Sequence, residues 1–372
     1  MAGWLVAASR APRGWSGAFD PTTWERNDSG QYLKIARHGY RMSTDCAGPT
    51  FPKDALPGKR LCGNVTWFAG YPALMRALSL TGLSTLAAGL VIAWLAWYLA
   101  LLMIWLLSAS QSPGVIADPL RWACLLLAAV FPGQVYFAAV FPVSLVAFGM
   151  LGSVYFATRA RRRWPALATG VAAGSAYLAS VALLPGLAAA FAVRPFRKYR
   201  TSITFAAAGL AAGVLAVLGY AQWAVGRWDA YFETERVEYR VGLHNPLPAV
   251  LARIEQLAQL ARPGVGRVTA EQTTLVWLVL ATAATCLAVA PLRSPRLPLS
   301  PSDVVLLLAA VTAWLIPYVA GGSLSVYRAE ALVIVAVPLL RRAPLVALPP
   351  LIALATAVAW QMAPLFFGRV LV

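Results

Sequence analysis

Residues 24–40 read WERNDSGQYLKIARHGY, a polar and aromatic stretch in a chain that is otherwise mostly apolar. Asp28 stands before a Ser-Gly pair, which allows a sharp backbone turn and favours a helix start. The spacing from Ser29 to Arg37 predicts a short helix. Its apolar members fall on one face (Tyr32, Ile35, Ala36), and its basic members fall mostly on another (Lys34, Arg37, His38). This pattern suits a base beside an anion clamp, but a plain interfacial helix that only meets lipid headgroups has the same pattern.

The composition of the whole chain is that of a membrane protein. Of its 372 residues, 60% are hydrophobic and 12% are charged, and the mean hydropathy is +0.67. In globular proteins about a quarter of the residues are charged. We therefore predict an all-α, polytopic bundle of transmembrane helices. The formal charge of +17 does not indicate nucleic acid, because the basic residues cluster in short loops between apolar segments, as cytoplasmic loops do.

Apolar runs locate the membrane segments. Helices that span are predicted at 80–107, 202–225, 271–291, 302–320, 328–340 and 344–367. The run 119–157 is interrupted by FPGQ and by a later Phe-Pro, so we predict shorter helices that meet within the bilayer. Residues 165–193 lie between two basic runs, and half of this segment is too short to span. We predict a re-entrant pair there, with the two basic runs on opposite faces as the alternative.

Loop charges divide the chain into four regions. Residues 1–79 are predicted to form a long extracytoplasmic loop that carries the catalytic residues, and 226–270 a second such loop with amphipathic helices. Membrane helices occupy 80–225 and 271–372. With the arginine-rich loops inside, GGSLSVYR (321–328) also lies outside, so three functional-looking segments face one compartment. The acids of the second loop are predicted to lie on a solvated helix face: Asp229, Glu233, Glu235 and Glu238.

The N-terminus and the cysteines give little information about the function. Met1 to Arg10 is no signal peptide, and the polar loop comes before any spanning helix. Either the N-terminus is translocated behind the first span, or a first helix is missing, which we favour. Cys124 and Cys286 lie in apolar runs and are predicted to pack there. Cys46 and Cys62 share one polar loop and would form a disulfide in an oxidising compartment; no spacing indicates a metal site.

The predicted outer face holds the residues for one kind of chemistry. Asp28 is the candidate base, with Asp20 and Asp45 as weaker competitors. Candidate cations are Lys34, Arg37, His38, Arg76 and Arg328. Such a set suits a lipid-linked anionic donor, since apolar helices hold the tail, cations hold a phosphate and a carboxylate activates an incoming hydroxyl. The ordinary alternatives are a snorkelling anchor for Arg328 and an interfacial residue for His38.

Four stretches carry a resemblance to a known family. RNDSGQYLKIARHGY (26–40) resembles the first-loop motif of the GPI mannosyltransferase II-like family. Three further stretches resemble later segments of that family: WFAGYPALMRAL (67–78), FPGQVYFAAVFPVS (131–144) and SLSVYRAEALVIVAVPLL (323–340). Only the first motif is specific. The chain departs from the family at Asn27, where the family has Trp, and at 141–144, where an acid is missing.

The resemblance implies a multi-span glycosyltransferase of the GT-C class, with an acidic catalytic residue in the first outer loop at the position of Asp28. Such enzymes take a sugar, usually mannose, from a polyprenyl- or dolichyl-phosphate donor, and are not thought to need a metal or other cofactor. The donor-phosphate and substrate-binding set would be Lys34, Arg37, His38, Tyr71, Arg76, Tyr327 and Arg328. The expected partners are the donor, a glycan or lipid-linked acceptor and membrane lipids, in a bacterial inner membrane with the site on the extracytoplasmic face.

Two other classes of function compete with a transferase. A transporter or lipid flippase predicts ionisable residues at mid-membrane and two repeated halves with broken helices. No clear internal repeat is present, and the predicted spans carry almost no charge. A non-catalytic membrane subunit or a decayed enzyme would explain the altered motifs.

Overall fold

The long apolar segments form helices, as predicted. The computed structural model describes residues 2–26, 28–43, 62–109, 118–258, 264–293, 299–321 and 326–371. In these parts the regular secondary structure is helical except for one antiparallel pairing of two-residue strands, β1 (Met42–Ser43) and β2 (Cys62–Gly63). Five helices among the described residues are long and apolar enough to cross a membrane: Thr85–Leu107, Arg194–Val225, Val265–Val289, Pro301–Ala320 and Leu345–Phe367. The prediction of an all-α membrane bundle is thus confirmed at this level.

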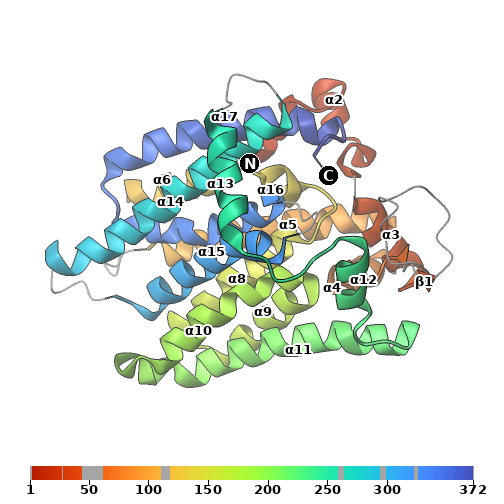
Figure 1. Cartoon of the computed structure of the whole chain (residues 1–372), viewed down its shortest axis with the longest axis horizontal. Coiled ribbons are helices and arrows are strands. Elements are labelled where there is room, and N and C mark those ends of the chain that lie inside the picture. The colour runs from red at the N-terminus through yellow and green to blue at the C-terminus, as the bar shows by residue number, and fades with distance from the viewer. Residues whose placement is uncertain are drawn as a thin grey trace.

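Shorter elements complete the chain. The first region contains α1 (Ala2–Ser9), α2 (Gly14–Ala18), η1 (Pro21–Trp24), α3 (Ser29–His38) and α4 (Gly70–Ser79). The long helices are α5 (Thr85–Leu107), α11 (Arg200–Val225), α14 (Val265–Arg293), α15 (Pro301–Ala320) and α17 (Leu348–Phe367). Between α11 and α14 lie α12 (Ala230–Glu238) and α13 (Pro246–Ala258). Figure 1 shows α2, α3, α4 and α12 near one end of the long helices, and the link from α10 to α11 at the other.

Proline and glycine break the second apolar run at the two predicted places. The pieces are α6 (Pro119–Ala129), α7 (Gln134–Ala138) and α8 (Val143–Thr158). Gly133, in the first break, has a φ of +80°, which glycine adopts without strain. A Cβ there would also lie 2.7 Å from the Cβ of Ala331, so glycine permits a close approach of the two segments. All residues of the breaks are buried, as a break at membrane depth requires.

The segment predicted as a re-entrant pair consists of α9 (Arg163–Ala176), η2 (Leu178–Ala182) and α10 (Leu183–Ala192), followed by η3 (Arg194–Tyr199). Helix α9 packs directly against α11 through two glycine pairs, Gly170/Gly174 and Gly209/Gly213. A Cβ on Gly174 would lie 2.2 Å from the carbonyl oxygen of Leu210, so the two backbones almost touch. Small residues four apart are how helices approach closely in membranes, where burial of apolar surface does not drive association.

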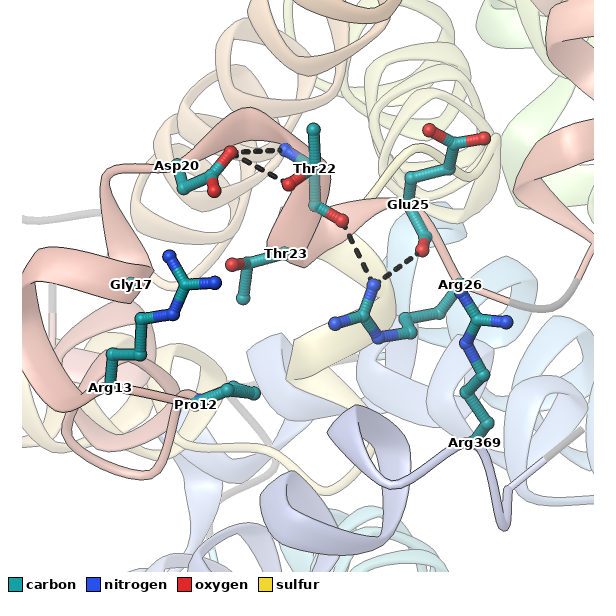
Figure 2. Close-up of a pocket in the computed structure, with 9 residues that line it drawn as sticks. All are labelled: Pro12, Arg13, Gly17, Asp20, Thr22, Thr23, Glu25, Arg26 and Arg369. Atoms are coloured by element: carbon teal, nitrogen blue, oxygen red, sulfur yellow. Dashed lines mark hydrogen bonds between the residues drawn. The ribbon is translucent and has the colours of Figure 1, made fainter.

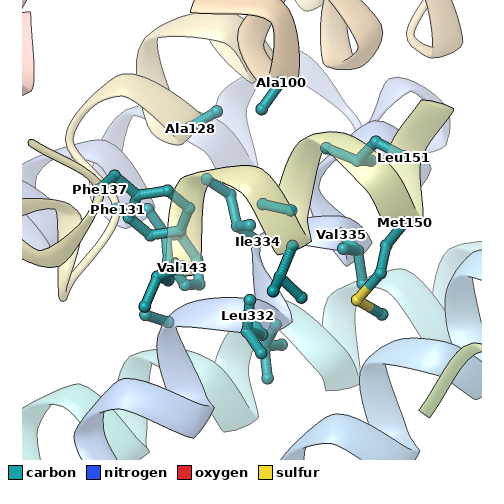
Figure 3. Packing of buried hydrophobic residues seen from close by; sticks show 14 of the residues in the cluster. Ala100, Ala128, Phe131, Phe137, Val143, Met150, Leu151, Leu332, Ile334 and Val335 are labelled. Atoms are coloured by element: carbon teal, nitrogen blue, oxygen red, sulfur yellow. The ribbon is translucent and has the colours of Figure 1, made fainter. Parts of the chain in front are cut away.

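One predicted span is not a regular helix. Residues 328–340 belong to α16 (Val326–Ala331) and to η4 (Leu332–Arg342), while η5 (Leu345–Ala347) leads into α17. Every residue from Leu332 to Leu340 is buried. Figure 3 shows Leu332, Ile334 and Val335 packed beside the residues of α8 and the broken segment before it. The sequence predicts a span at 328–340; the structure has no single regular helix there and covers Leu332–Leu340 with protein, which an apolar run alone does not indicate.

Candidate functional site

The helix predicted at 29–37 is α3, and its sidedness is confirmed. Asp28 is the residue that precedes its first turn, and the hydroxyl of Ser29 accepts a hydrogen bond from the backbone N–H of Arg26 at 3.2 Å. The predicted apolar face is buried: Tyr32, Ile35 and Ala36. The predicted basic face is exposed: Lys34, Arg37 and His38. The local pattern thus fixes which side of α3 faces the bundle and leaves Asp28 at its N-terminal edge.

An ion pair joins Asp28 to Arg328 across 300 positions of sequence. The Nη1 atom of Arg328 donates to Oδ2 of Asp28, and the two side chains are 18% and 20% exposed. The guanidinium carbon of Arg328 also lies 5.7 Å from the ring centre of Phe141. The first loop and α16 therefore meet at a half-buried pair of opposite charges that borders the broken helix segment.

Buried hydrogen bonds hold α16 in place. The carboxylate of Glu330 is fully buried and accepts hydrogen bonds from the hydroxyls of Thr273 at 2.8 Å and Tyr318 at 3.0 Å. The side-chain amide of Gln272 donates to the carbonyl oxygen of Tyr327 at 2.8 Å. Since buried polar groups are costly unless they are bonded, these contacts fix α16 against α14 and α15 and thereby fix the position of Arg328.

Aromatic rings surround the ion pair. Tyr136 stacks on Tyr327 with ring centres 5.9 Å apart, and it meets Phe141 edge-on at 5.3 Å. Tyr32 packs edge-on against Tyr71 at 5.7 Å. Tyr71, predicted to bind substrate, is fully buried, and its hydroxyl donates to the carbonyl oxygen of Gly89 at 2.8 Å. It therefore supports Tyr32 and the packing of α4 on α5, and presents no free polar atom to a substrate.

The remaining predicted cations lie away from the ion pair. Arg37 and His38 occupy the last turn of α3, about 14 Å along the helix axis from Asp28. Arg76 is exposed near the end of α4, at an apolar pocket of about 330 Å³ that Ile35 and Ala36 also line. The structure thus brings Asp28, Tyr327 and Arg328 together, while Lys34, Arg37, His38 and Arg76 are exposed.

Sequence reasoning missed one acidic residue of this neighbourhood. Asp229 and Glu233 pair with Arg227 and Arg236 at 2.8 Å on the partly exposed side of α12, as expected for a solvated face. Glu235 instead interacts electrostatically with Arg328 and Asp28, and its Oε2 atom is buried without a hydrogen-bond partner among the described residues. A signal was present in the sequence, because Glu235 follows Tyr231 by one helical turn and so shares its buried face.

Burial of Glu235 leads to a prediction about pH. Burial raises the pKa of Glu235 from 4.5 to about 7. Because the folded protein holds this proton more tightly than the unfolded chain, the contribution of Glu235 to stability is fully present below pH 4.5 and should fall by about 3 kcal/mol as the pH rises to 7. We expect Glu235→Gln to flatten this part of the profile. Unfolding midpoints in neutral detergent between pH 4.5 and 8 measure it, and parallel profiles for both proteins would contradict the assignment.

Two further sequence predictions meet the structure only in part. Cys124 is buried and Cys286 is partly buried, consistent with packing roles. Cys46, and with it the predicted disulfide to Cys62, lies outside the described residues, as does Asp45. Asp20, the other competitor for the catalytic carboxylate, accepts hydrogen bonds from the backbone N–H and hydroxyl of Thr22 at 2.9 and 2.8 Å, so it is used to cap η1.

The described residues form a helical protein with helices long and apolar enough to span a membrane, and an ion pair joins Asp28 to α16. No known family model matches the chain, and a search of curated proteins gives no match. The likeness to the GPI mannosyltransferase II-like family therefore rests on the motifs quoted above.

Proposed function

We propose that the chain is an integral-membrane glycosyltransferase that moves a hexose, with mannose favoured, from a polyprenyl-phosphate donor to a glycan or lipid-linked acceptor. The observation that carries the proposal is the contact of Asp28 with Arg328. A carboxylate and a guanidinium held together, half-buried and at the edge of an apolar bundle, supply the proton acceptor and the phosphate ligand that such a transfer needs.

The chemistry is a single displacement. The acceptor hydroxyl oxygen attacks the anomeric carbon, the bond from that carbon to the phosphate oxygen breaks, and the lipid phosphate leaves with the electron pair. The hydroxyl proton passes to Asp28. In the structure Arg328 donates a hydrogen bond to this carboxylate. A donor phosphate that draws the guanidinium to itself would release the carboxylate to the acceptor, so donor binding and base activation would be coupled.

Two features outside the pair itself support a lipid-borne donor: the apolar pocket beside Arg76 and the short helix pair α9 and α10. The apolar pocket lined by Ile35, Ala36 and Pro72 offers about 330 Å³ beside α3, enough for part of an isoprenoid chain. The short pair α9 and α10 meets near Tyr177, which interacts electrostatically with Arg328 and Asp28. We propose that this pair is re-entrant and that the ion pair lies on the extracytoplasmic side, because the basic runs at the far end would then be cytoplasmic.

Arg328 provides a test of its role as phosphate ligand. We expect Arg328→Gln to raise the KM for the donor about tenfold to a hundredfold, since a charge-assisted hydrogen bond to phosphate is lost. Arg328→Lys keeps the charge but not the two-pronged geometry, so it should fall between wild type and Arg328→Gln. Transfer from labelled polyprenyl-phosphate mannose to membrane acceptors, measured over a range of donor concentrations, gives KM and kcat separately.

The matched control is Arg227→Gln, which removes an exposed arginine paired with an acid in the same region. It should leave both constants unchanged. An unchanged KM for the donor in Arg328→Gln would show that phosphate binds elsewhere. Movement of labelled lipid across proteoliposomes without sugar transfer would support the flippase alternative.

A further inference from the structure

A second cluster of arginines lies outside the site described above. Three of them line one pocket of about 340 Å³: Arg13, Arg26 and Arg369. The pocket is formed where α2 and η1 meet the end of α17, and its volume is in the range of small-molecule sites. Figure 2 shows the guanidinium of Arg13 reaching toward Thr23, with Arg26 and Arg369 close together at the opposite edge.

The three arginines of this pocket outnumber the two acids that also line it, Asp20 and Glu25. None of the three arginines forms an ion pair with a residue that the structure describes. Arg26 donates to the carbonyl oxygens of Thr22 at 2.9 Å and Glu25 at 2.7 Å, which fixes it at the edge of the pocket. Burial and the neighbouring charge of Arg369 lower the pKa of Arg26. Arg26 and Arg369 thus repel each other at one edge of the pocket, and Arg13 lines the opposite edge.

The two acids that line the pocket, Asp20 and Glu25, interact electrostatically with its arginines but form no ion pair with them among the described residues. The carboxylate of Asp20 already accepts two hydrogen bonds from Thr22. In Figure 2 the carboxylate of Glu25 points away from the guanidinium groups. An anion that bound between the arginines would therefore gain charge-assisted hydrogen bonds without displacing an internal ion pair.

The backbone at two of the arginines is unusual. Arg13 and Arg369 have φ angles of 64° and 57°, in the left-handed region that side chains rarely adopt. Arg369 follows a glycine, Gly368, that could have taken such a conformation more easily, whereas Gly14, after Arg13, has a positive φ (60°) as well. Strained residues of this kind cluster at binding and active sites. Here the strain falls on two side chains that line the same pocket.

Exposed aromatic rings indicate where the pocket lies relative to lipid. Trp15 and Phe19, in and just after α2, are 50% and 72% exposed. Trp is enriched at the level of lipid headgroups, where its amphipathic ring is favoured. A pocket beside these rings would be within reach of groups carried at the membrane surface.

We propose that the pocket lined by Arg13, Arg26 and Arg369 binds a phosphate group, carried on a lipid headgroup at the membrane surface, at a site separate from the Asp28–Arg328 pair. Guanidinium groups match the geometry and charge of phosphate oxygens, and three donors around one space allow several contacts at once. Phosphate binding in this pocket does not require that the protein transfers a sugar.

Thermal unfolding of the purified full chain tests the proposal in two arms. In neutral detergent, sodium phosphate is compared with sodium chloride at equal ionic strength. In phosphatidylcholine nanodiscs, discs with phosphatidic acid are compared with discs without it. We expect phosphate to raise the unfolding midpoint in the first arm and phosphatidic acid to raise it more in the second. A rise only with soluble phosphate would keep the phosphate site and assign it to a soluble ligand, contradicting the lipid-borne part of the proposal.

Variants of the lining arginines test whether phosphate raises the unfolding midpoint by binding in this pocket. The double variant Arg13→Gln with Arg369→Gln should lose the rise, and the corresponding Lys pair should keep most of it. The corresponding Gly pair should lose the rise without a lower starting midpoint, since glycine relieves the backbone strain. Arg161→Gln serves as the control, because Arg161 also has a positive φ (53°) and is exposed, but lies after α8.

Arg328→Gln separates this site from the proposed donor site. The phosphate-dependent rise should persist in Arg328→Gln. Loss of the rise in Arg328→Gln with its retention in the Arg13 and Arg369 variants would overturn the proposal, as would no rise in either arm for the wild type. Because no donor or transfer enters the measurement, this result is independent of whether the chain is a glycosyltransferase.

Discussion

Replacing Asp28 by Asn should lower the rate of sugar transfer by roughly a thousandfold, within the range that a positioned general base contributes. This corresponds to about 4 kcal/mol of transition-state stabilisation. Asn keeps the size of the side chain and can still accept a hydrogen bond from Arg328, so the fold should persist. The assay is transfer from labelled polyprenyl-phosphate mannose in membranes, with protein amount and membrane insertion checked by size-exclusion chromatography of a fluorescent fusion.

The matched control for Asp28→Asn is Asp229→Asn, which removes a carboxylate from an exposed pair with Arg227 in the same region. It should retain wild-type transfer. Glu235→Gln, tested in the same assay, addresses whether the second carboxyl group shares the proton transfer. Full activity in Asp28→Asn together with loss of activity in Glu235→Gln would move the base to α12. Full activity in both variants would show that neither Asp28 nor Glu235 acts as the general base.

The parts that the sequence predicts well are those where a short pattern decides the structure. The sidedness of α3 follows from the spacing of Tyr32, Ile35 and Ala36. The two breaks before α8 follow from proline and glycine, which cannot continue a helix without cost. Charge and span counting also led us to expect the first loop and the loop before Arg328 on one face, and the ion pair of Asp28 with Arg328 is consistent with this.

The parts that it misses depend on contacts between distant segments. An apolar run has the same sequence pattern whether lipid or protein covers it. The sequence at 328–340 therefore could not show that protein buries η4. The burial of Glu235 depends on how α12 is seated, which its own residues indicate only weakly. The cations predicted to bind the donor phosphate lie on different elements. Lys34, Arg37 and His38 are on the exposed face of α3, whereas Arg328 belongs to α16.

A second ion cluster, at Asp303, should have the largest effect on stability. The side chain of Asp303 is fully buried at the start of α15 and pairs with Arg341 and, at 2.6 Å, with Arg342. It also accepts a hydrogen bond from the backbone N–H of Ser300 at 2.9 Å. Asp303→Asn keeps an acceptor for that N–H but removes the carboxylate charge that faces two mostly buried guanidinium groups. We expect a loss of about 3–5 kcal/mol in the free energy of unfolding.

Denaturant titration in mixed micelles measures this loss, with Asp229→Asn as the exposed control, for which about 0–1 kcal/mol is expected. Adding Arg341→Gln to Asp303→Asn should recover part of the stability, because the more buried of the two guanidinium charges is then removed with its partner. If the double variant is instead less stable than Asp303→Asn by the full cost of Arg341→Gln alone, the two residues act independently. The cluster would then stabilise the protein through packing and capping of α15, and its charges would be balanced by solvent or lipid.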